Sequence, residues 1–241
     1  PVQFTLANYQ RVLIQAQFRR SFMISLERTV LGTTINILIV AVTAYPLSVA
    51  EGFRGQRLAK WLLIFGMLFS GGLIPTYLAI RSLGLLDKIW ALILPGAVPI
   101  WSVIILVNFY RQVPSEMAEA ASMDGASHWD ILFRIYLPLS LPSLATLTLF
   151  AAVGHWNAWF DGLIYLVKAD NYPLQTYVRN IVISISQLSG IGSSAEYIWS
   201  KISLRSLQAA QIFITALPIL MLYPFLQRYF VTGLTLGSVK G

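Results

Sequence analysis

The sequence of 241 residues contains no cysteine and only two histidines, His128 and His155. Without cysteine the chain has no disulfide bonds and no thiolate ligands for a metal. Two histidines are also too few for a histidine metal cluster. A membrane enzyme would need a catalytic constellation near the bilayer, and two isolated histidines do not supply one. We therefore predict neither a metal site nor catalytic residues.

Charged residues are scarce as well. They make up 11% of the sequence, hydrophobic residues make up 56%, and the mean hydropathy is +0.67. Soluble domains carry about 25% charged residues, so this composition predicts a membrane protein. The alternating segments of about ten residues that are typical of transmembrane β-barrels are absent. We predict an all-α fold, a polytopic transmembrane helical bundle in which residues 1–241 form one domain.

Five apolar segments approach the length of about 20 residues that a helix needs to cross a bilayer. They cover residues 30–50, 61–80, 89–110, 141–167 and 204–230. Glycine and proline recur inside them, and membrane helices tolerate both because neighbouring groups satisfy the freed backbone. These interruptions favour helices bent around a cavity, although plain packing kinks explain any single one equally well. The first 20 residues look amphipathic and are predicted to lie at an interface.

A polar stretch, EAASMDGASHWDILFRIYLP at residues 119–138, lies between two apolar segments. We predict that a short helix starts just before it, with Ser115 as its cap. Gly125 suits the left-handed position that ends a helix. A second helix is predicted to start at Ser127, which forms a capping box with Asp130.

The second of these helices is predicted to carry an apolar face. Its members, at spacings i, i+3, i+4 and i+7, are Trp129, Leu132, Phe133 and Tyr136. Pro138 is predicted to end the helix. An ordinary solvated loop between spans needs neither two capped helices nor an apolar face. The pattern therefore predicts a water-exposed pair of helices that docks a soluble partner.

The same stretch resembles the EAA loop of ABC importer permeases, whose pattern is EAA, three residues, G, nine residues and I-x-L-P. The segments FTLANYQRVL, WNAWFDGLIYL and YFVTGLTLGSVKG resemble the maltose-type, carbohydrate-uptake subfamily. The resemblance covers nearly the whole chain. The resemblance implies that nine residues couple this chain to an ATPase. They are Glu119, Ala120, Ala121, Asp124, Gly125, Ala126, Ile135, Leu137 and Pro138.

The resemblance implies a transporter subunit of the bacterial cytoplasmic (inner) membrane rather than an enzyme. Residues 111–140 would be a cytoplasmic coupling loop, in which Glu119 faces a basic residue of the ATPase, and residues 168–203 an extracytoplasmic loop. Family members usually have six spans, which places the first upstream of Pro1.

The resemblance also implies a set of partners. They are a second, homologous permease, two cytoplasmic ABC ATPase subunits, an extracytoplasmic solute-binding protein, an oligosaccharide and the lipid bilayer, but no nucleic acid. The sequence lacks the G-x-x-x-x-G-K-[ST] phosphate loop. ATP and Mg²⁺ would therefore bind to the partner ATPase, and this chain would need no cofactor.

The stretch GHWNAWFDG, residues 154–162, is the strongest candidate for a substrate path. Polar groups in or near a membrane span suggest function, and sugars bind to flat apolar faces combined with hydrogen-bonding groups. The candidate residues are His155, Trp156, Asn157, Trp159 and Asp161. Tryptophan near a membrane boundary is also often only an anchor. Weaker candidates are Asn108, Gln211 and Thr215, because such residues more often join helices.

The charge distribution gives a further indication. If the polar stretch is cytoplasmic, ten of the 17 Lys and Arg residues lie on the outer side, with four acidic residues, for a net charge of +6. The positive-inside rule favours the reverse orientation, but the motif is the more specific signal. A basic outer surface would attract an acidic oligosaccharide or an acidic binding protein, and contact with anionic lipid is the alternative explanation.

Other functions remain open at this point. The EAA pattern alone is compatible with an importer for amino acids, peptides or phosphate. A carrier or channel that works without ATP is disfavoured, because it has no ATPase to dock.

Overall fold

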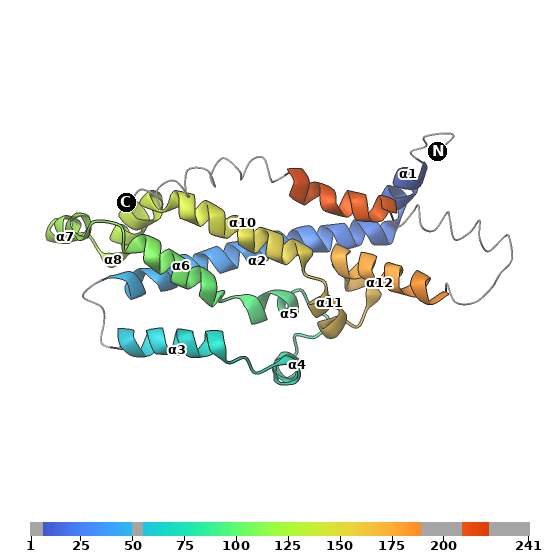
Figure 1. The fold of residues 1–241 in the computed structure, drawn as a ribbon, viewed down its shortest axis with the longest axis horizontal. Helices are drawn as coiled ribbons and strands as arrows, with labels where there is room; N and C mark the ends of the chain where they lie inside the picture. The colour runs from blue at the N-terminus through green and yellow to red at the C-terminus, as the bar shows by residue number, and fades with distance from the viewer. Residues whose placement is uncertain (1–6, 50–54, 189–208, 222–241) are drawn as a thin grey trace, which may run out of the picture. The chain divides into compact units, whose positions relative to one another are not determined.

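The computed structural model describes residues 7–49, 55–188 and 209–221. Within those ranges the chain forms helices joined by turns and short irregular segments, and contains no strand, which confirms the predicted all-α class (Figure 1). The helices of the first half are α1 (Ala7–Ile14), α2 (Ala16–Ser48), α3 (Gln56–Leu68), α4 (Leu73–Ser82), α5 (Trp90–Ile93), the 3-10 helix η1 (Leu94–Gly96) and α6 (Ile100–Tyr110).

The second half begins with the polar stretch. Its helices are α7 (Ser115–Met123), α8 (His128–Ile131), the π-helix η2 (Leu132–Tyr136), α9 (Leu137–Leu139), α10 (Leu141–Asn157), α11 (Phe160–Tyr165), the 3-10 helix η3 (Ala169–Asn171) and α12 (Leu174–Leu188). A further apolar helix covers Ala209–Met221.

One helix of the described residues, α2, is long and apolar enough to cross a membrane alone. Three bent helix pairs pass the same test when each pair is taken together, which gives up to four spans. The predicted fifth span, 204–230, is described only over Ala209–Met221, and its remaining residues lie outside the described ranges.

Glycines and prolines coincide with breaks in two of the apolar segments, 61–80 and 89–110, whereas Pro46 lies inside the continuous helix α2. Gly72 lies between α3 and α4 with φ +81°, a conformation that glycine adopts easily. The prediction of one span over 141–167 is wrong as a single helix, because α10 ends at Asn157 and α11 begins at Phe160. At this break the Thr176 hydroxyl donates a hydrogen bond of 2.8 Å to the carbonyl oxygen of Trp159, which no longer continues a helix.

The chain divides into two compact units. The first unit comprises residues 1–30, 77–92 and 153–223, and the second unit comprises 31–76, 93–152 and 224–241. The largest apolar core of the second unit joins the C-terminal half of α2, α6 and the helices after α7, through Val40, Ala44, Val103, Leu106, Leu132 and Leu147. An apolar core of the first unit gathers around Phe18, Trp156 and Leu174.

Candidate coupling element and substrate-path residues

The coupling element, defined here as α7 through α9 (residues 115–139), begins after a proline. Pro114 occupies the cap position with extended backbone, and no side chain caps α7. The prediction that Ser115 caps this helix is therefore wrong, since Ser115 is its first helical residue. The N–H groups of the first turn of any helix have no partner within the helix, and here the proline ring fixes the backbone just before that turn.

The turn after α7 is the helix ending that the sequence predicts. Gly125 has φ +83°, and a side chain there would be strained. The Ala126 N–H donates to the Ala121 carbonyl at 2.9 Å, and the Gly125 N–H donates to the Ser122 carbonyl at 3.1 Å. This pair of bonds is the Schellman motif, which satisfies the last carbonyls of a helix.

The predicted capping box at α8 is confirmed. The Asp130 N–H donates to the Ser127 hydroxyl oxygen, and the Ser127 N–H donates to the Asp130 carboxylate, each at 3.2 Å. Arg134 lies 3.5 Å from the same carboxylate, one turn later. The turn between the two helices is therefore specified by local hydrogen bonds on both sides.

The predicted single apolar face of the second helix is wrong. Leu132 and Tyr136 are buried, at 1% and 5% exposure, whereas Trp129 and Phe133 are 58% and 55% exposed and stack on each other at 6.1 Å. The cause is the π-helix over Leu132–Tyr136, since its wider turn changes which residues share a face. The result is one buried face and one exposed aromatic pair.

Pro138 does not end the helix where the sequence predicts. It lies in α9, which directly follows the π-helix, and the helix continues one residue further, to Leu139. The chain then turns at Ser140, and α10 continues at 82° to the preceding helices. The coupling element is thus set at a steep angle to the long apolar helix that follows it.

The nine residues that the resemblance assigns to coupling fall into two groups. Five of them line a surface pocket of about 440 Å³, formed where the turn faces the second helix: Ala121, Asp124, Gly125, Ala126 and Ile135. Glu119 and Ala120 are exposed on α7, outside this pocket, and Pro138 is exposed at the far end. Leu137 packs against the core of the second unit.

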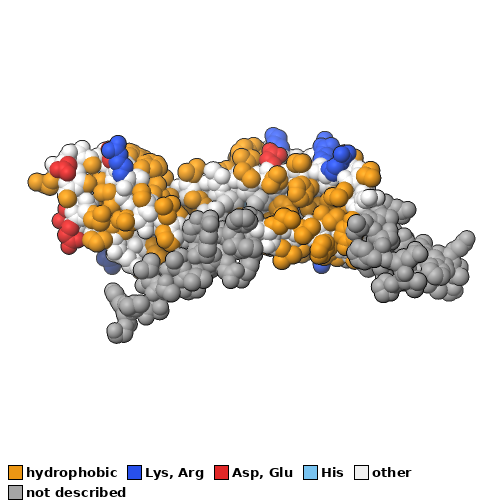
Figure 2. All heavy atoms as spheres, turned by 90° about the horizontal axis from the view of Figure 1, so that it is seen from above, with side chains coloured by type: hydrophobic (Ala, Val, Ile, Leu, Met, Phe, Trp, Pro, Cys, Tyr) orange, Lys and Arg blue, Asp and Glu red, His pale blue; other side chains and the backbone are white. Residues whose placement is uncertain are grey.

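Acidic residues dominate the exposed charge of α7 and its turn. Glu116, Glu119 and Asp124 are all exposed, and Figure 2 shows acidic side chains gathered at this end of the second unit. A partner that docks here therefore meets negative charge, which favours a basic surface.

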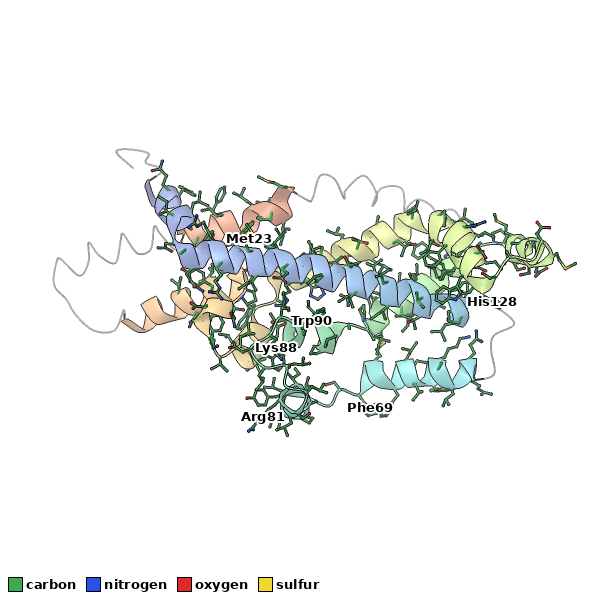
Figure 3. The ribbon with its side chains drawn as sticks, turned by 180° about the vertical axis from the view of Figure 1, so that it is seen from behind. Met23, Phe69, Arg81, Lys88, Trp90 and His128 are labelled. Carbon is green, nitrogen blue, oxygen red and sulfur yellow. The ribbon has the colours of Figure 1, made fainter. Side chains whose placement is uncertain are left out.

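Three tyrosines and a histidine connect the coupling element to α2 and α6. The Tyr45 hydroxyl and His128 Nδ1 form a hydrogen bond of 3.2 Å, and Figure 3 shows His128 beside the C-terminal end of α2. The Tyr136 ring lies edge-on to Tyr45 at 5.1 Å and to Tyr110 at 5.3 Å. Sequence reasoning missed this cluster, because its members are far apart in the chain.

The substrate-path candidates do not share one environment. Trp156 is 5% exposed, donates its ring N–H to the Thr215 carbonyl at 3.1 Å and meets Phe22 edge-on. His155 is half-buried and Asn157 is exposed. Trp159 is half-buried, and the Arg179 guanidinium lies over its ring.

The weaker candidates are also separated. Gln211 and Thr215 are buried, and the Thr215 hydroxyl donates to the Gln211 carbonyl at 2.7 Å, as helix residues often do. Asn108 is exposed.

Asp161 forms an ion pair with Arg28, a residue that sequence reasoning missed. Both guanidinium N–H groups reach the carboxylate, and the Arg28 side chain is only 3% exposed whereas that of Asp161 is 26% exposed. Arg28 also donates to the carbonyls of Ala158 at 3.2 Å and Leu92 at 3.4 Å. Arg28 therefore adds no free positive charge to the surface of the first unit. The sequence gives no clear signal for this pair, because Arg28 directly follows Glu27 and lies before the predicted span over residues 30–50.

Comparison with known proteins agrees with the sequence pattern. The model of the family described as "binding-protein-dependent transport system inner membrane component" matches residues 21–236. Protein LplC of Bacillus subtilis is 43% identical over 241 residues, which cover 100% of this chain and 81% of LplC. The polygalacturonan/rhamnogalacturonan transport system permease protein YtcP of the same organism is 40% identical over 245 residues, and the match covers 100% of this chain and 84% of YtcP.

A solved structure is similar as well. The crystal structure of a bacterial ABC transporter involved in the import of the acidic polysaccharide alginate contains a chain that matches with a TM-score of 0.84 and 30% identity. The match covers 95% of this chain and 81% of that chain.

Proposed function

This chain belongs to the binding-protein-dependent transport system inner membrane component family, and from that premise we propose that it is one permease subunit of an ATP-driven importer of acidic oligosaccharides. It is a transporter subunit and not an enzyme. The coupling element carries the proposal, because it places five motif residues around one exposed pocket on a chain of this family.

The proposed substrate class rests on two relatives and on charge. YtcP is named for polygalacturonan and rhamnogalacturonan, and the solved neighbour belongs to an importer of alginate. Polygalacturonan and alginate are polymers of uronic acids, so both are polyanions. The net positive charge predicted for the outer side suits such a substrate. An amino acid, peptide or phosphate has no comparable support.

In the proposed assembly, this chain pairs with a second, homologous permease in the bacterial inner membrane. Two ATPase subunits bind ATP and Mg²⁺ in the cytoplasm, and an extracytoplasmic binding protein delivers the sugar. The coupling element rests on one ATPase subunit, with Glu119 facing a basic residue. When the ATPases close, the element moves as a rigid body, and Tyr45 and Tyr136 pass the motion to α2 and α6.

The proposal is tested with the complete importer in proteoliposomes. We expect binding protein loaded with trigalacturonate to stimulate ATP hydrolysis and uptake. Glu119→Ala is expected to lower uptake about tenfold, as the loss of a charge-assisted contact predicts. Glu116→Ala, one turn earlier and also exposed, is the matched control. Equal effects of the two substitutions would remove the role of Glu119.

The sugar class is tested in the same vesicles with maltotriose, a neutral trisaccharide. Equal or faster uptake of maltotriose would contradict the acidic substrate while leaving a carbohydrate importer. Uptake of neither sugar, with hydrolysis stimulated by another solute, would contradict the carbohydrate assignment.

A further inference from the structure

A cation and an aromatic ring meet on the surface of the first unit. The guanidinium carbon of Arg179, on α12, lies 4.8 Å from the centroid of the Trp159 ring. Arg179 is exposed and Trp159 is half-buried. Phe160 is 51% exposed, and its ring meets that of Trp159 edge-on at 5.7 Å. The arrangement offers an apolar ring surface with a positive charge beside it.

The backbone around this pair is held by close packing between α11 and α12, which lie side by side (Figure 1). The buried Thr176 hydroxyl donates to the Trp159 carbonyl at 2.8 Å. Gly162 approaches Thr176 so closely that a Cβ at this position would clash with the Thr176 side chain. Leu174, at the start of α12, is fully buried in the core. These contacts fix the backbone of α12 relative to Trp159, and the contact of the guanidinium with the ring places Arg179 beside it.

Arg179 differs from three other cations of the first unit. Those three lie against carboxylates: Arg20 with Asp170, Lys168 with Asp87 and Arg28 with Asp161. Burial favours the neutral form of Asp87. The hydrogen bonds from the N–H groups of Lys168 and Val167 and from the Asn171 side chain, together with the positive charge of Lys168, outweigh burial and hold the pKa of that carboxyl below its usual value. Asp87 therefore stays ionised beside Lys168 at neutral pH. Among the described residues Arg179 has no carboxylate partner.

The chemistry of the pair matches an acidic sugar. A guanidinium that stacks on a ring still presents N–H groups along its edge, in the fork that fits a carboxylate. Exposed aromatic rings offer the apolar surface on which the C–H face of a sugar packs. A uronic acid carries a carboxylate and an apolar face on one ring. Building on the proposed function, we infer that Arg179, Trp159 and Phe160 form a subsite for one uronate unit, whose carboxylate binds to Arg179.

The subsite is tested with the complete importer in proteoliposomes, with its binding protein and with trigalacturonate as the probe. Arg179→Gln is expected to lower uptake about tenfold, because a charge-assisted bidentate contact is lost. Arg179→Lys keeps the positive charge but not the fork of N–H groups, and it is expected to lower uptake less than Arg179→Gln does. Arg20→Gln removes the same charge from an exposed cation that already has a partner, Asp170, and is expected to leave uptake unchanged.

Three results would overturn the subsite. Equal losses in Arg179→Gln and Arg20→Gln would show that only the surface charge matters. Weaker binding of the sugar-free binding protein to Arg179→Gln vesicles would show that Arg179 docks that protein instead. If the unsubstituted importer does not take up trigalacturonate, the proposed function fails with this substrate. If it does and Arg179→Gln matches it, the subsite alone is wrong.

Discussion

Arg28 and Asp161 join three separate segments of the first unit. The guanidinium binds the carboxylate and the carbonyls of Ala158 and Leu92, so one side chain links α2 to the break before α11 and to the end of α5. A buried ion pair adds little stability over apolar residues of the same shape. Removal of one partner is a different matter, because the other charge then remains buried without compensation.

At this residue scale we predict that Asp161→Asn destabilises the protein by about 3–5 kcal/mol, since it leaves the Arg28 charge uncompensated. In thermal unfolding of the detergent-solubilised complex, the midpoint should fall by about 10 °C. Asp170→Asn is the control, because it affects the exposed ion pair between Arg20 and Asp170, whose charged atoms lie 4.0 Å apart. It should change the unfolding midpoint little.

The double substitution of Arg28→Met with Asp161→Leu should recover most of that loss, because no charge is then left buried. If Asp161→Asn unfolds at the same temperature as the unsubstituted complex, the pair has no structural role, and Asp161 becomes a stronger candidate for contact with the substrate.

Single residues were predictable from the sequence where their surroundings are local. Gly125 and Ser127 interact with groups three or four residues away, so their patterns alone predict the turn and the capping box. The roles of Arg28 and Trp156 depend on partners more than 50 residues distant. In the sequence Arg28 directly follows Glu27, and only the fold shows that Arg28 binds the distant carboxylate of Asp161.

At the scale of elements, the coupling element is a local structure attached to the second unit by distant contacts. Its turn needs only its own hydrogen bonds. Its attachment to α2 needs the Tyr45–His128 hydrogen bond and the packing of Tyr136 between Tyr45 and Tyr110. Helical periodicity did not predict that packing, because the π-helix changes which side chains face the core.

We predict that Tyr45→Phe lowers the amount of sugar imported per ATP hydrolysed about fivefold, since it removes a hydrogen bond of about 1 kcal/mol and keeps the ring packing. ATP hydrolysis without substrate should be unchanged. Both quantities are measured in the same vesicles. Tyr77→Phe changes a half-buried tyrosine of the first unit that stacks on Tyr165 and is the matched control. Unaltered import per ATP in Tyr45→Phe would mean that this bond transmits no motion.

At the scale of the whole molecule, composition predicted the helical class, but not where the apolar segments break. Three of the five predicted spans, 30–50, 61–80 and 89–110, have their counterpart in α2 or in a bent helix pair, whereas the segment 141–167 is divided between α10 and α11. Length and hydropathy cannot locate such breaks, because the groups that stabilise them, such as Thr176 at the break before Phe160, come from other parts of the chain. The prediction of one domain over residues 1–241 stays a prediction.

The central claim is that the coupling element docks an ATPase subunit, and the cysteine-free sequence allows a direct measurement. Met123 is 89% exposed at the end of α7, and Leu83 is 70% exposed in the first unit. Thiol labelling of Met123→Cys and Leu83→Cys is compared in the permease alone and in the complete importer. We predict that assembly protects only the Met123→Cys thiol, and that a short thiol cross-linker joins it to the ATPase. Equal labelling of the Met123→Cys thiol with and without the ATPase, or a cross-link to the ATPase from Leu83→Cys instead, would contradict the account.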